Sequence, residues 1–125
     1  MATAPQYVGT PRSPTVTIAT ANINRDGTTG TYGTLYTAGA SGGRVDVISI
    51  NATGNTTAGM IRLFVGNSMI REVPVLGATP SATVQAWSHD LAFSPGLVLA
   101  AAAVLRASTQ NGEPFNLTIT NGGDF

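Results

Sequence analysis

The residue types of a catalytic triad stand together at one place in this chain, Ser88-His89-Asp90. In a triad the serine attacks, the histidine takes the proton of the serine, and the aspartate orients the histidine. His89 is in strand phase with Trp87 and Leu91, and neighbouring side chains on a strand point to opposite faces. The three residues therefore cannot bond in series, and we expect His89 to be a partly buried, neutral residue with one structural hydrogen bond.

A second stretch has the spacing of half a calcium-binding loop. From Asn22 to Gly27, oxygen-bearing side chains stand at alternate positions and a glycine is sixth. The second half of the loop fails, because Gly33 occupies the position of the bidentate glutamate that completes such a site. Asp26 is the single carboxylate of the stretch and lies next to Arg25, which weakens the attraction for a divalent ion. We interpret the stretch as an Asp-Gly turn and predict no metal ion.

The rest of the chain offers no other reactive set. It contains one histidine, no cysteine and six acidic residues, and the acids lie in separate segments. Paired carboxylates for glycoside hydrolysis are therefore not identifiable. No glycine-rich phosphate loop precedes a helix, because the sequence has no convincing helix. We predict that the protein is not an enzyme, binds no cofactor, and has no catalytic, cofactor-binding or metal-binding residues.

Charge is sparse and balanced in this chain. Charged residues make up 10% of it, against about 25% in a typical soluble domain, and the formal net charge is +0. The six basic residues are scattered arginines, so no basic patch for a nucleic acid is present. Little electrostatic repulsion opposes the association of copies. We therefore expect a homo-oligomer, with a weakly associating monomer as the alternative.

Segments that would take the chain to a membrane are not apparent. The longest apolar run, residues 97–105, is far shorter than the ~20 residues of a membrane-spanning helix. Residues 1–5 have neither a basic head nor an apolar run, so we expect no signal peptide. The sequence thus predicts neither a membrane partner nor a nucleic-acid partner.

Alternation of apolar and polar residues predicts the secondary structure. In residues 115–120 the apolar side chains stand at odd numbers and the polar ones at even numbers, as in a strand with one face toward a core. Turn residues separate about eight such segments, which are 15–21, 31–38, 44–52, 60–65, 69–75, 83–93, 97–109 in two pieces around a turn at 100–103, and 115–120. Short strands of this kind predict an all-β fold, an antiparallel β-sandwich or jelly roll of about eight strands.

Three local features refine this prediction. The apolar residues change face between Val47 and Ile48, so their strand has a bulge or is buried on both sides. Pro74 cannot donate to a ladder, which places its segment at a sheet edge or a strand end. Residues 121–125 are predicted to be a tail that ends in an aromatic side chain.

Residues 1–14 are predicted to be an extended N-terminal arm ahead of a single β-sandwich domain, residues 15–125. The arm contains Pro5, Pro11 and Pro14, and proline fixes φ and removes a hydrogen-bond donor. The arm should therefore stay out of any central strand and lie in solvent or across a neighbouring subunit.

Candidate interface residues come from this arm and from a strand with two apolar faces. Met60 and Phe64 stand on the face opposite the other large apolar residues of 60–65. This strand is either central in a layered core or presents Met60 and Phe64 to a partner. Arginine tolerates interfaces better than lysine does. The predicted interface residues are Pro5, Tyr7, Pro11, Arg12, Met60, Arg62, Phe64 and Phe125.

Trp87, the single tryptophan, separates two interpretations of the chain. It shares its strand phase with Leu91 and Phe93, so we predict that its indole fills the core of the sandwich. The alternative is an exposed aromatic platform on which a sugar could stack.

Several stretches resemble short virion proteins of phages and prophages. The resemblance spans about residues 20–125 and is carried by Arg25-Asp26-Gly27-Thr28, Thr57-Ala58-Gly59-Met60-Ile61-Arg62-Leu63-Phe64, Arg71-Glu72-Val73-Pro74-Val75, Thr79-Pro80-Ser81-Ala82-Thr83-Val84-Gln85-Ala86-Trp87, Leu105-Arg106-Ala107-Ser108-Thr109 and Gly122-Gly123-Asp124-Phe125. Small all-β proteins of this type are similar in size to the decoration (cement) proteins on the capsids of tailed phages. The shared motifs are structural rather than catalytic.

This resemblance implies a structural protein of the virion. The expected partner is the major capsid protein, whose neighbouring subunits the protein would clamp and so stabilise. The resemblance also implies a homo-oligomer, with a trimer favoured, and a location on the capsid surface after synthesis in the host cytoplasm. The alternative function is a tail-associated receptor-binding or carbohydrate-binding module.

Overall fold

The computed structural model describes residues 8–125, so the predicted interface residues Pro5 and Tyr7 lie outside the described part. Within residues 8–125 the chain forms nine strands and no helix, which confirms the all-β prediction. The strands are β1 (Thr10–Pro11), β2 (Thr15–Ile18), β3 (Gly33–Thr37), β4 (Gly43–Ala52), β5 (Gly59–Val65), β6 (Ser68–Val75), β7 (Ser88–Leu99), β8 (Val104–Thr109) and β9 (Phe115–Asp124).

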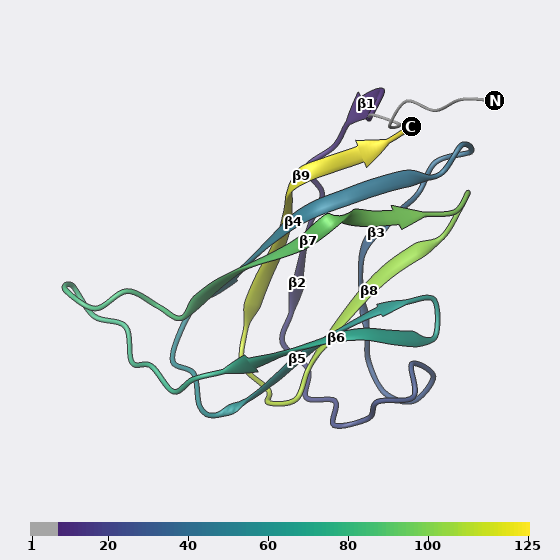
Figure 1. Cartoon of the computed structure of the whole chain (residues 1–125). Helices are drawn as coiled ribbons and strands as arrows, with labels where there is room; N and C mark the ends of the chain where they lie inside the picture. Colours follow the sequence, from purple (N-terminus) through teal and green to yellow (C-terminus); the bar gives the residue numbers. More distant parts are fainter. Residues whose placement is uncertain (1–7) are drawn as a thin grey trace.

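The strands form two antiparallel sheets that lie one against the other (Figure 1). The first sheet has the order β1-β9-β4-β7, with β2 also paired to β9, and the second has the order β3-β8-β5-β6. Strand β2 pairs with β9, β3 with β8, β4 with β7, and β5 with β6, as in a long antiparallel ribbon rolled into two layers. This is the winding of a jelly roll, so the predicted sandwich is confirmed.

The core fills the space between the two sheets. Both sheets contribute branched aliphatic side chains that have almost no contact with solvent, among them Ile48, Ile50, Leu117, Ile119, Ile61, Leu63 and Leu105. Burial of one such side chain contributes about 1.5–3 kcal/mol relative to leaving it exposed. The apolar residues of the alternating segments therefore form the core between the sheets.

Two local predictions for the strands are confirmed. The pairing of β4 shifts register between Val45 and Val47 against both β7 and β9, as expected from the change of apolar face. Strands β5 and β6 form a hairpin, whose turn contains Gly66 with a φ of 60°. Pro74 lies in β6, which is an edge strand and does not need the missing N–H donor on its free side.

Other predicted boundaries are wrong. Strand β7 begins at Ser88 and not at residue 83, because the Ser81 hydroxyl accepts the N–H groups of Thr83 and Val84 and holds a local turn. The predicted tail belongs largely to β9, which runs to Asp124. Residues at the end of β9 pair with both β4 and β1, a long-range arrangement that the local pattern does not contain.

The described part of the predicted arm, residues 8–14, lies at the edge of the first sheet. Thr10 and Pro11 pair with Asp124 and Gly123 of β9. Gly123 has a φ of 153°, and a side chain at this position would collide with the backbone of β1. A glycine at residue 123 thus allows β1 to approach β9 closely.

The turn between β7 and β8 falls at residues 100–103, as predicted from the alanines. Ala103 donates its N–H to the carbonyl oxygen of Ala100 at 3.1 Å. Ala102 has a φ of 61°, the left-handed region that glycine adopts more easily than alanine.

We expect Ala102→Gly to raise the free energy of unfolding by about 0.5–1 kcal/mol, because glycine removes the strain of the left-handed backbone. The matched control is Ala101→Gly, which should lower the same quantity by about 0.5–1 kcal/mol, because glycine there only adds freedom to the unfolded chain. Urea denaturation of both variants measures the difference, and a decrease for both would contradict the prediction.

Candidate interaction surfaces

The triad-like residues do not form a reactive site. In β7, Ser88 and Asp90 pair with Asn51 and Ser49 of β4, while His89 has the opposite phase. His89 is exposed, so the prediction of a partly buried histidine is wrong. The reason is that β7 is the edge strand of the first sheet, so no further strand covers its free side. The three side chains thus have no arrangement for nucleophilic catalysis.

The Asp26 stretch is the predicted turn. The carboxylate of Asp26 accepts the N–H groups of Thr28 and Thr29, both at 3.0 Å, and the Thr29 hydroxyl at 2.7 Å. These bonds, with the Thr29 hydroxyl as the largest cause, hold the pKa of Asp26 far below its usual range. Within residues 8–125, no group of three or more histidine, aspartate or glutamate side chains is placed to hold a metal ion.

Residues 19–32, here named the cover segment, lie over the outer face of the second sheet. Phe64 is completely buried on this face, and its ring meets that of Tyr32 edge-on with the centroids 5.0 Å apart. Arg62 is 1% exposed and donates from Nη1 to the carbonyl oxygen of Asn22 at 3.3 Å. The expectation that Arg62 and Phe64 face a partner is therefore wrong, because the chain covers both with its own residues.

Two further arginines attach the cover segment to the sheet. Arg25 Nε donates to Glu72 Oε1 of β6 at 3.1 Å, and this bond is the main cause of a lowered pKa of Glu72. Arg106 of β8 donates to the carbonyl oxygen of Gly27 at 2.9 Å, and its guanidinium carbon lies 4.2 Å from the centre of the Tyr32 ring. The cover segment is thus a fixed third layer of the fold.

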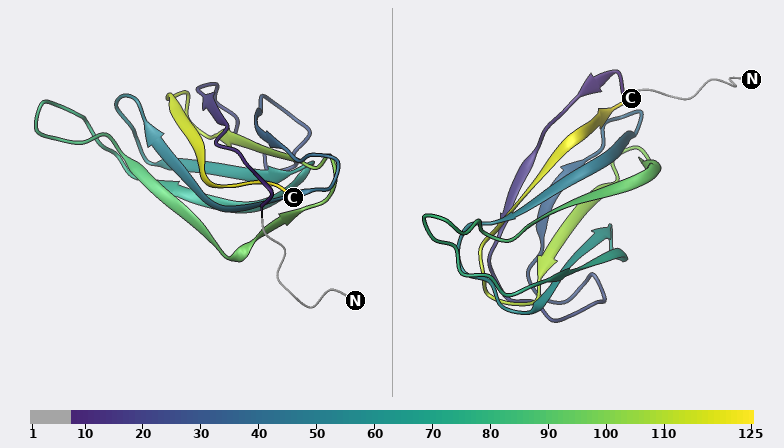
Figure 2. Two further views of the ribbon diagram at one scale, coloured as in Figure 1. Left: turned by 90° about the horizontal axis from the view of Figure 1, so that it is seen from above. Right: turned by 60° about the vertical axis from the view of Figure 1, so that its left-hand side comes forward.

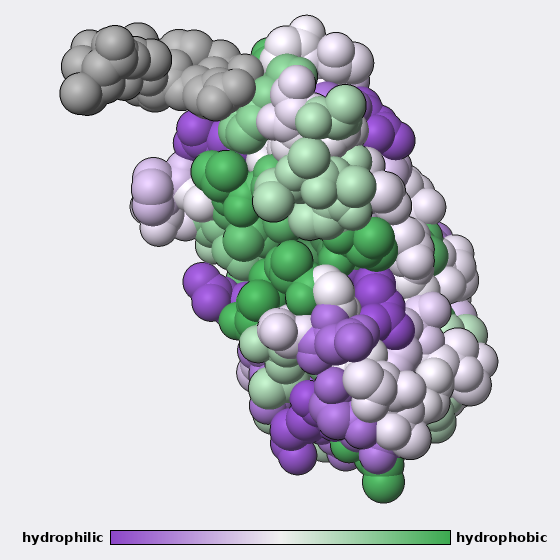
Figure 3. Space-filling view, turned by 90° about the vertical axis from the view of Figure 1, so that its right-hand side faces the viewer, coloured by the Kyte–Doolittle hydropathy of each residue, from purple (hydrophilic) through white to green (hydrophobic). Residues whose placement is uncertain are grey.

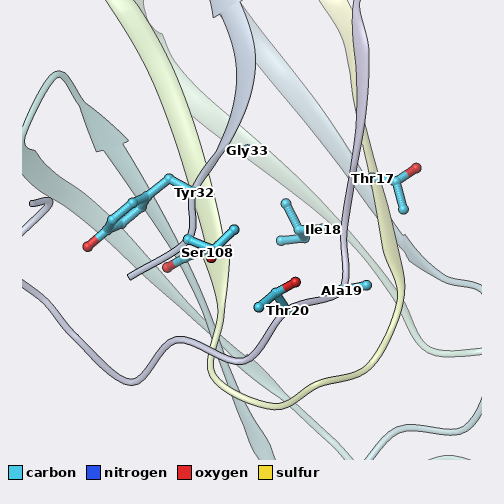
Figure 4. Close-up of a pocket in the computed structure, with 8 residues that line it drawn as sticks. Thr17, Ile18, Ala19, Thr20, Tyr32, Gly33 and Ser108 are labelled. Atoms are coloured by element: carbon cyan, nitrogen blue, oxygen red, sulfur yellow. The ribbon is translucent and has the colours of Figure 1, made fainter. Parts of the chain in front are cut away.

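A small pocket lies between β2, β8 and the end of the cover segment (Figure 4). Its volume is about 100 Å³, and its lining contains no charged side chain: Thr17, Ile18, Ala19, Thr20, Thr31, Tyr32, Gly33 and Ser108. The Ser108 hydroxyl is buried and has no hydrogen-bond partner within the protein. No base stands beside these hydroxyls to activate one of them, so the lining suits small neutral polar molecules such as water.

Three predicted interface residues meet at the end of β9. Pro11 pairs with the strand, Arg12 Nη1 donates to Asp124 Oδ2 at 3.3 Å, and Phe125 donates its N–H to the carbonyl oxygen of Gly42 at 3.1 Å. Pro11 and Arg12 are exposed and Phe125 is half-buried. Met60 is half-buried on β5, apart from this group. The described members of the predicted set therefore do not form one surface.

Asp124 also binds the hydroxyl of Tyr36 and the N–H of Gly39, the latter at 3.1 Å. The hydrogen bond from Tyr36 is the largest cause of a lowered pKa of Asp124. Burial, followed by this bond, raises the pKa of Tyr36 to about 12. The cluster joins β3, β9 and Arg12, which follows β1.

We expect the protein to lose stability between about pH 10 and about pH 12, because Tyr36 has its ordinary pKa of 10.0 in the unfolded chain and one of about 12 in the fold. The raised pKa means that the fold is stabilised while the Tyr36 hydroxyl is protonated. This stabilisation is complete below about pH 10 and is lost as the pH passes about 12. Thermal unfolding of the wild type and Tyr36→Phe measures it. The Tyr36→Phe variant should be less stable than the wild type at neutral pH, and its stability should fall less between about pH 10 and about pH 12. An equal fall in both proteins would contradict the assignment of the pH dependence to Tyr36.

Comparison of the chain with protein-family models, curated proteins and solved structures found no match. The described residues, 8–125, contain no helix of the length and apolarity needed to cross a membrane. The function is therefore argued from the surfaces that the fold leaves exposed.

The connection between β6 and β7, here named the β6–β7 loop (residues 76–87), extends away from the sandwich (Figure 2). It contains no charged residue. Leu76 is 68% exposed and Val84 is 50% exposed, which is unusual for two large aliphatic side chains in one loop. The absence of charge was visible in the sequence, but exposure was not, because residues 83–87 had the pattern of a strand.

The opposite end of β7 carries a second apolar surface, here named the β7–β8 tip (Val98 and residues 100–102). Val98 is 66% exposed, and the three alanines are exposed as well. Met69 of the β5–β6 hairpin is 36% exposed at the same end of the sandwich. Figure 3, which views this end, has a continuous band of hydrophobic residues across it. Residues 94–105 contain no charge, and the charged groups next to Val98 are Arg44 of β4, its partner across the strands, and Asp46, to which Arg44 Nε donates at 2.8 Å.

Proposed function

We propose that the protein is a structural protein of a phage virion, which decorates the capsid and stabilises it by clamping neighbouring subunits of the major capsid protein. The observation that carries the proposal is the pair of exposed apolar surfaces, the β6–β7 loop and the β7–β8 tip, at the two ends of the sandwich. Exposed apolar surface of this kind marks sites of protein association. The choice of the major capsid protein as the partner rests on the resemblance to small virion proteins.

The physical basis of the proposed clamping is burial of these side chains against the shell. A Leu or Val side chain that is fully buried contributes about 1.5–3 kcal/mol. A protein that binds only the assembled lattice shifts the equilibrium toward it, by about 2.7 kcal/mol per site when its free concentration is 100 times Kd. Jelly rolls serve in viral capsids, so the fold is compatible with this function, although fold alone does not determine it.

The test is binding of the purified protein to capsids assembled without it. We expect the wild type to bind and to raise the temperature at which the shell dissociates. Val84→Asp should weaken binding at least about tenfold, because an unpaired carboxylate loses its water on contact. The matched control is Thr79→Asp, which adds the same charge at another exposed position of the loop. Absence of wild-type binding would remove the proposal.

A second candidate, a tail-associated receptor-binding or carbohydrate-binding module, is favoured by one observation. Trp87 and His89 stack with ring centroids 6.3 Å apart and an angle of 10° between planes, at the base of the β6–β7 loop. Trp87 is only half-buried, although its ring edge meets Phe115 of the core at 5.9 Å. Jelly rolls also form lectin domains.

Fluorescence of Trp87 discriminates the two candidates. On the capsid hypothesis the emission of Trp87 is unchanged by glycans. On the carbohydrate hypothesis a cell-surface glycan shifts the emission, and a folded Trp87→Ala variant no longer binds that glycan. A panel of host-surface glycans, with His89→Ala as a second variant of the stack, provides the measurement.

A further inference from the structure

We propose that the small pocket between β2, β8 and the cover segment binds a vicinal diol, which is a pair of hydroxyl groups on adjacent carbon atoms. The diol belongs either to a small polyol or to the edge of a sugar. This inference goes beyond the proposed function and does not depend on it, because the lining contains no residue of the β6–β7 loop or the β7–β8 tip.

The first argument is the hydroxyl group of Ser108. This residue lines the pocket and is 1% exposed, and its Oγ has no hydrogen-bond partner within the protein. A buried polar group without a partner is unfavourable, and most such groups in folded proteins are bonded. A molecule that enters the pocket is in a position to supply the missing bond.

The polar side chains around Ser108 are directed elsewhere. Arg62, its partner across the strands, points Nε toward Glu72 Oε2 at 3.6 Å. The hydroxyl group of Tyr32, which also lines the pocket, donates to the carbonyl oxygen of Thr29 at 2.9 Å. The fold therefore leaves the Ser108 hydroxyl for a ligand.

The second argument is the size and the layout of the pocket (Figure 4). Its volume of about 100 Å³ equals that of about three water molecules at ~30 Å³ each, which admits a group of only a few non-hydrogen atoms. Ser108 and Ile18 are buried and form its inner end, whereas Thr20 and Thr31 are exposed and form its outer end. The pocket thus offers hydroxyl groups at both ends and an apolar side chain beside them.

The third argument is the chemistry that such a lining selects. No charged side chain lines the pocket, and an ionised ligand would lose its water without meeting an opposite charge. A hydroxyl group both donates and accepts, so it suits the Ser108 hydroxyl in either role. Two hydroxyl groups on adjacent carbon atoms bond the inner and the outer end together, while their carbon atoms contact Ile18. A neutral diol therefore fits better than a single alcohol or an ion.

The experiment is an NMR titration of the ¹⁵N-labelled chain with glycerol. We expect the amide signals of lining residues such as Gly33 and Ser108 to shift and to saturate, with a Kd on the order of 10 mM for a ligand of so few atoms. The indole signal of Trp87, which lies outside the lining, should not move. The alcohol n-propanol has the same carbon chain and one hydroxyl group, so it should bind at least about tenfold more weakly.

Ser108→Ala tests the inner end of the pocket. The variant loses no hydrogen bond within the protein, so it should be at least as stable as the wild type in the absence of glycerol. It should bind glycerol at least about tenfold more weakly, because the ligand loses a bond to a buried group. The matched control is Ser41→Ala, at an exposed serine outside the lining, which should bind like the wild type.

A methyl hexoside, which presents a diol on a ring, identifies the source of the ligand. Saturable binding of the hexoside at the lining residues would assign the diol to a sugar, and binding of glycerol alone would assign it to a free polyol. Three outcomes would overturn the inference: no saturable shift with either compound, shifts spread over the whole chain, or equal binding of glycerol by Ser108→Ala. A hexoside that moves only the Trp87 signal would also overturn it and would favour the carbohydrate hypothesis. Binding to capsids tests the proposed function separately.

Discussion

Replacement of Arg62 by alanine is expected to lower the free energy of unfolding by about 3 kcal/mol. The guanidinium is buried on the outer face of the second sheet, where Nη1 donates to the carbonyl oxygen of Asn22 and Nη2 donates to Gln110 Oε1 at 2.9 Å. Alanine leaves both acceptors without a donor and removes the support beneath the cover segment. Glu72, whose Oε2 lies 3.6 Å from Nε of Arg62, keeps its bonds to Arg25.

The matched control is Arg71→Ala on the adjacent strand β6. Arg71 is exposed and lies over the ring of Phe93, with 5.3 Å between the guanidinium carbon and the ring centre. Such a contact contributes about 0.5–1 kcal/mol at an exposed site, so the loss should be correspondingly small. Urea denaturation compares the two variants directly. Equal small losses would contradict the buried position of Arg62 beneath the cover segment.

The strands were predictable where their determinants are local. The alternation in residues 115–120 identifies β9, and the change of apolar face at Val47 identifies the bulge of β4. In both cases the local pattern of apolar and polar residues shows which face of the strand is buried. The turn between residues 60–65 and 69–75 was likewise predictable from the turn residues around Gly66. These features require no knowledge of the rest of the fold.

The outer layer was not predictable in the same way. Two apolar faces on residues 60–65 indicate that both sides are covered, but the pattern does not say whether another molecule or the chain itself covers the second side. The answer is the cover segment, whose contact with Arg62 joins residues 40 positions apart. The prediction for His89 was wrong for a related reason, since its exposure depends on the position of β7 at the edge of the first sheet.

The same reasoning explains the interface candidates. Pro11, Arg12 and Phe125 lie together only because β1 and the end of β9 pair across almost the whole chain. The sequence did not reveal the β6–β7 loop and the β7–β8 tip as exposed surfaces. Whether a residue is exposed depends on how the whole chain packs, which the local pattern does not contain. The sequence does contain one sign of such surfaces, which is a stretch with apolar residues and no charged residue, as in 76–87 and 94–105.

Phe115→Ala should lower the free energy of unfolding by about 3–5 kcal/mol, as large-to-small changes in a core do. Phe115 is 1% exposed, and its ring meets the edge of Trp87 at 5.9 Å. Without this ring, water reaches the indole, so the native emission of Trp87, the single tryptophan, should shift to the red.

Phe93→Ala separates these two effects. Phe93 is also buried, at 9% exposure, but it lies six residues further along the chain from Trp87. Its removal should cost a comparable free energy of unfolding, about 3 kcal/mol, and leave the native emission unchanged. Emission spectra of the folded variants and their urea denaturation curves give both quantities. An unshifted spectrum for Phe115→Ala would mean that Trp87 does not depend on the core, and its stack with His89 would then be a free aromatic platform, as the carbohydrate hypothesis requires.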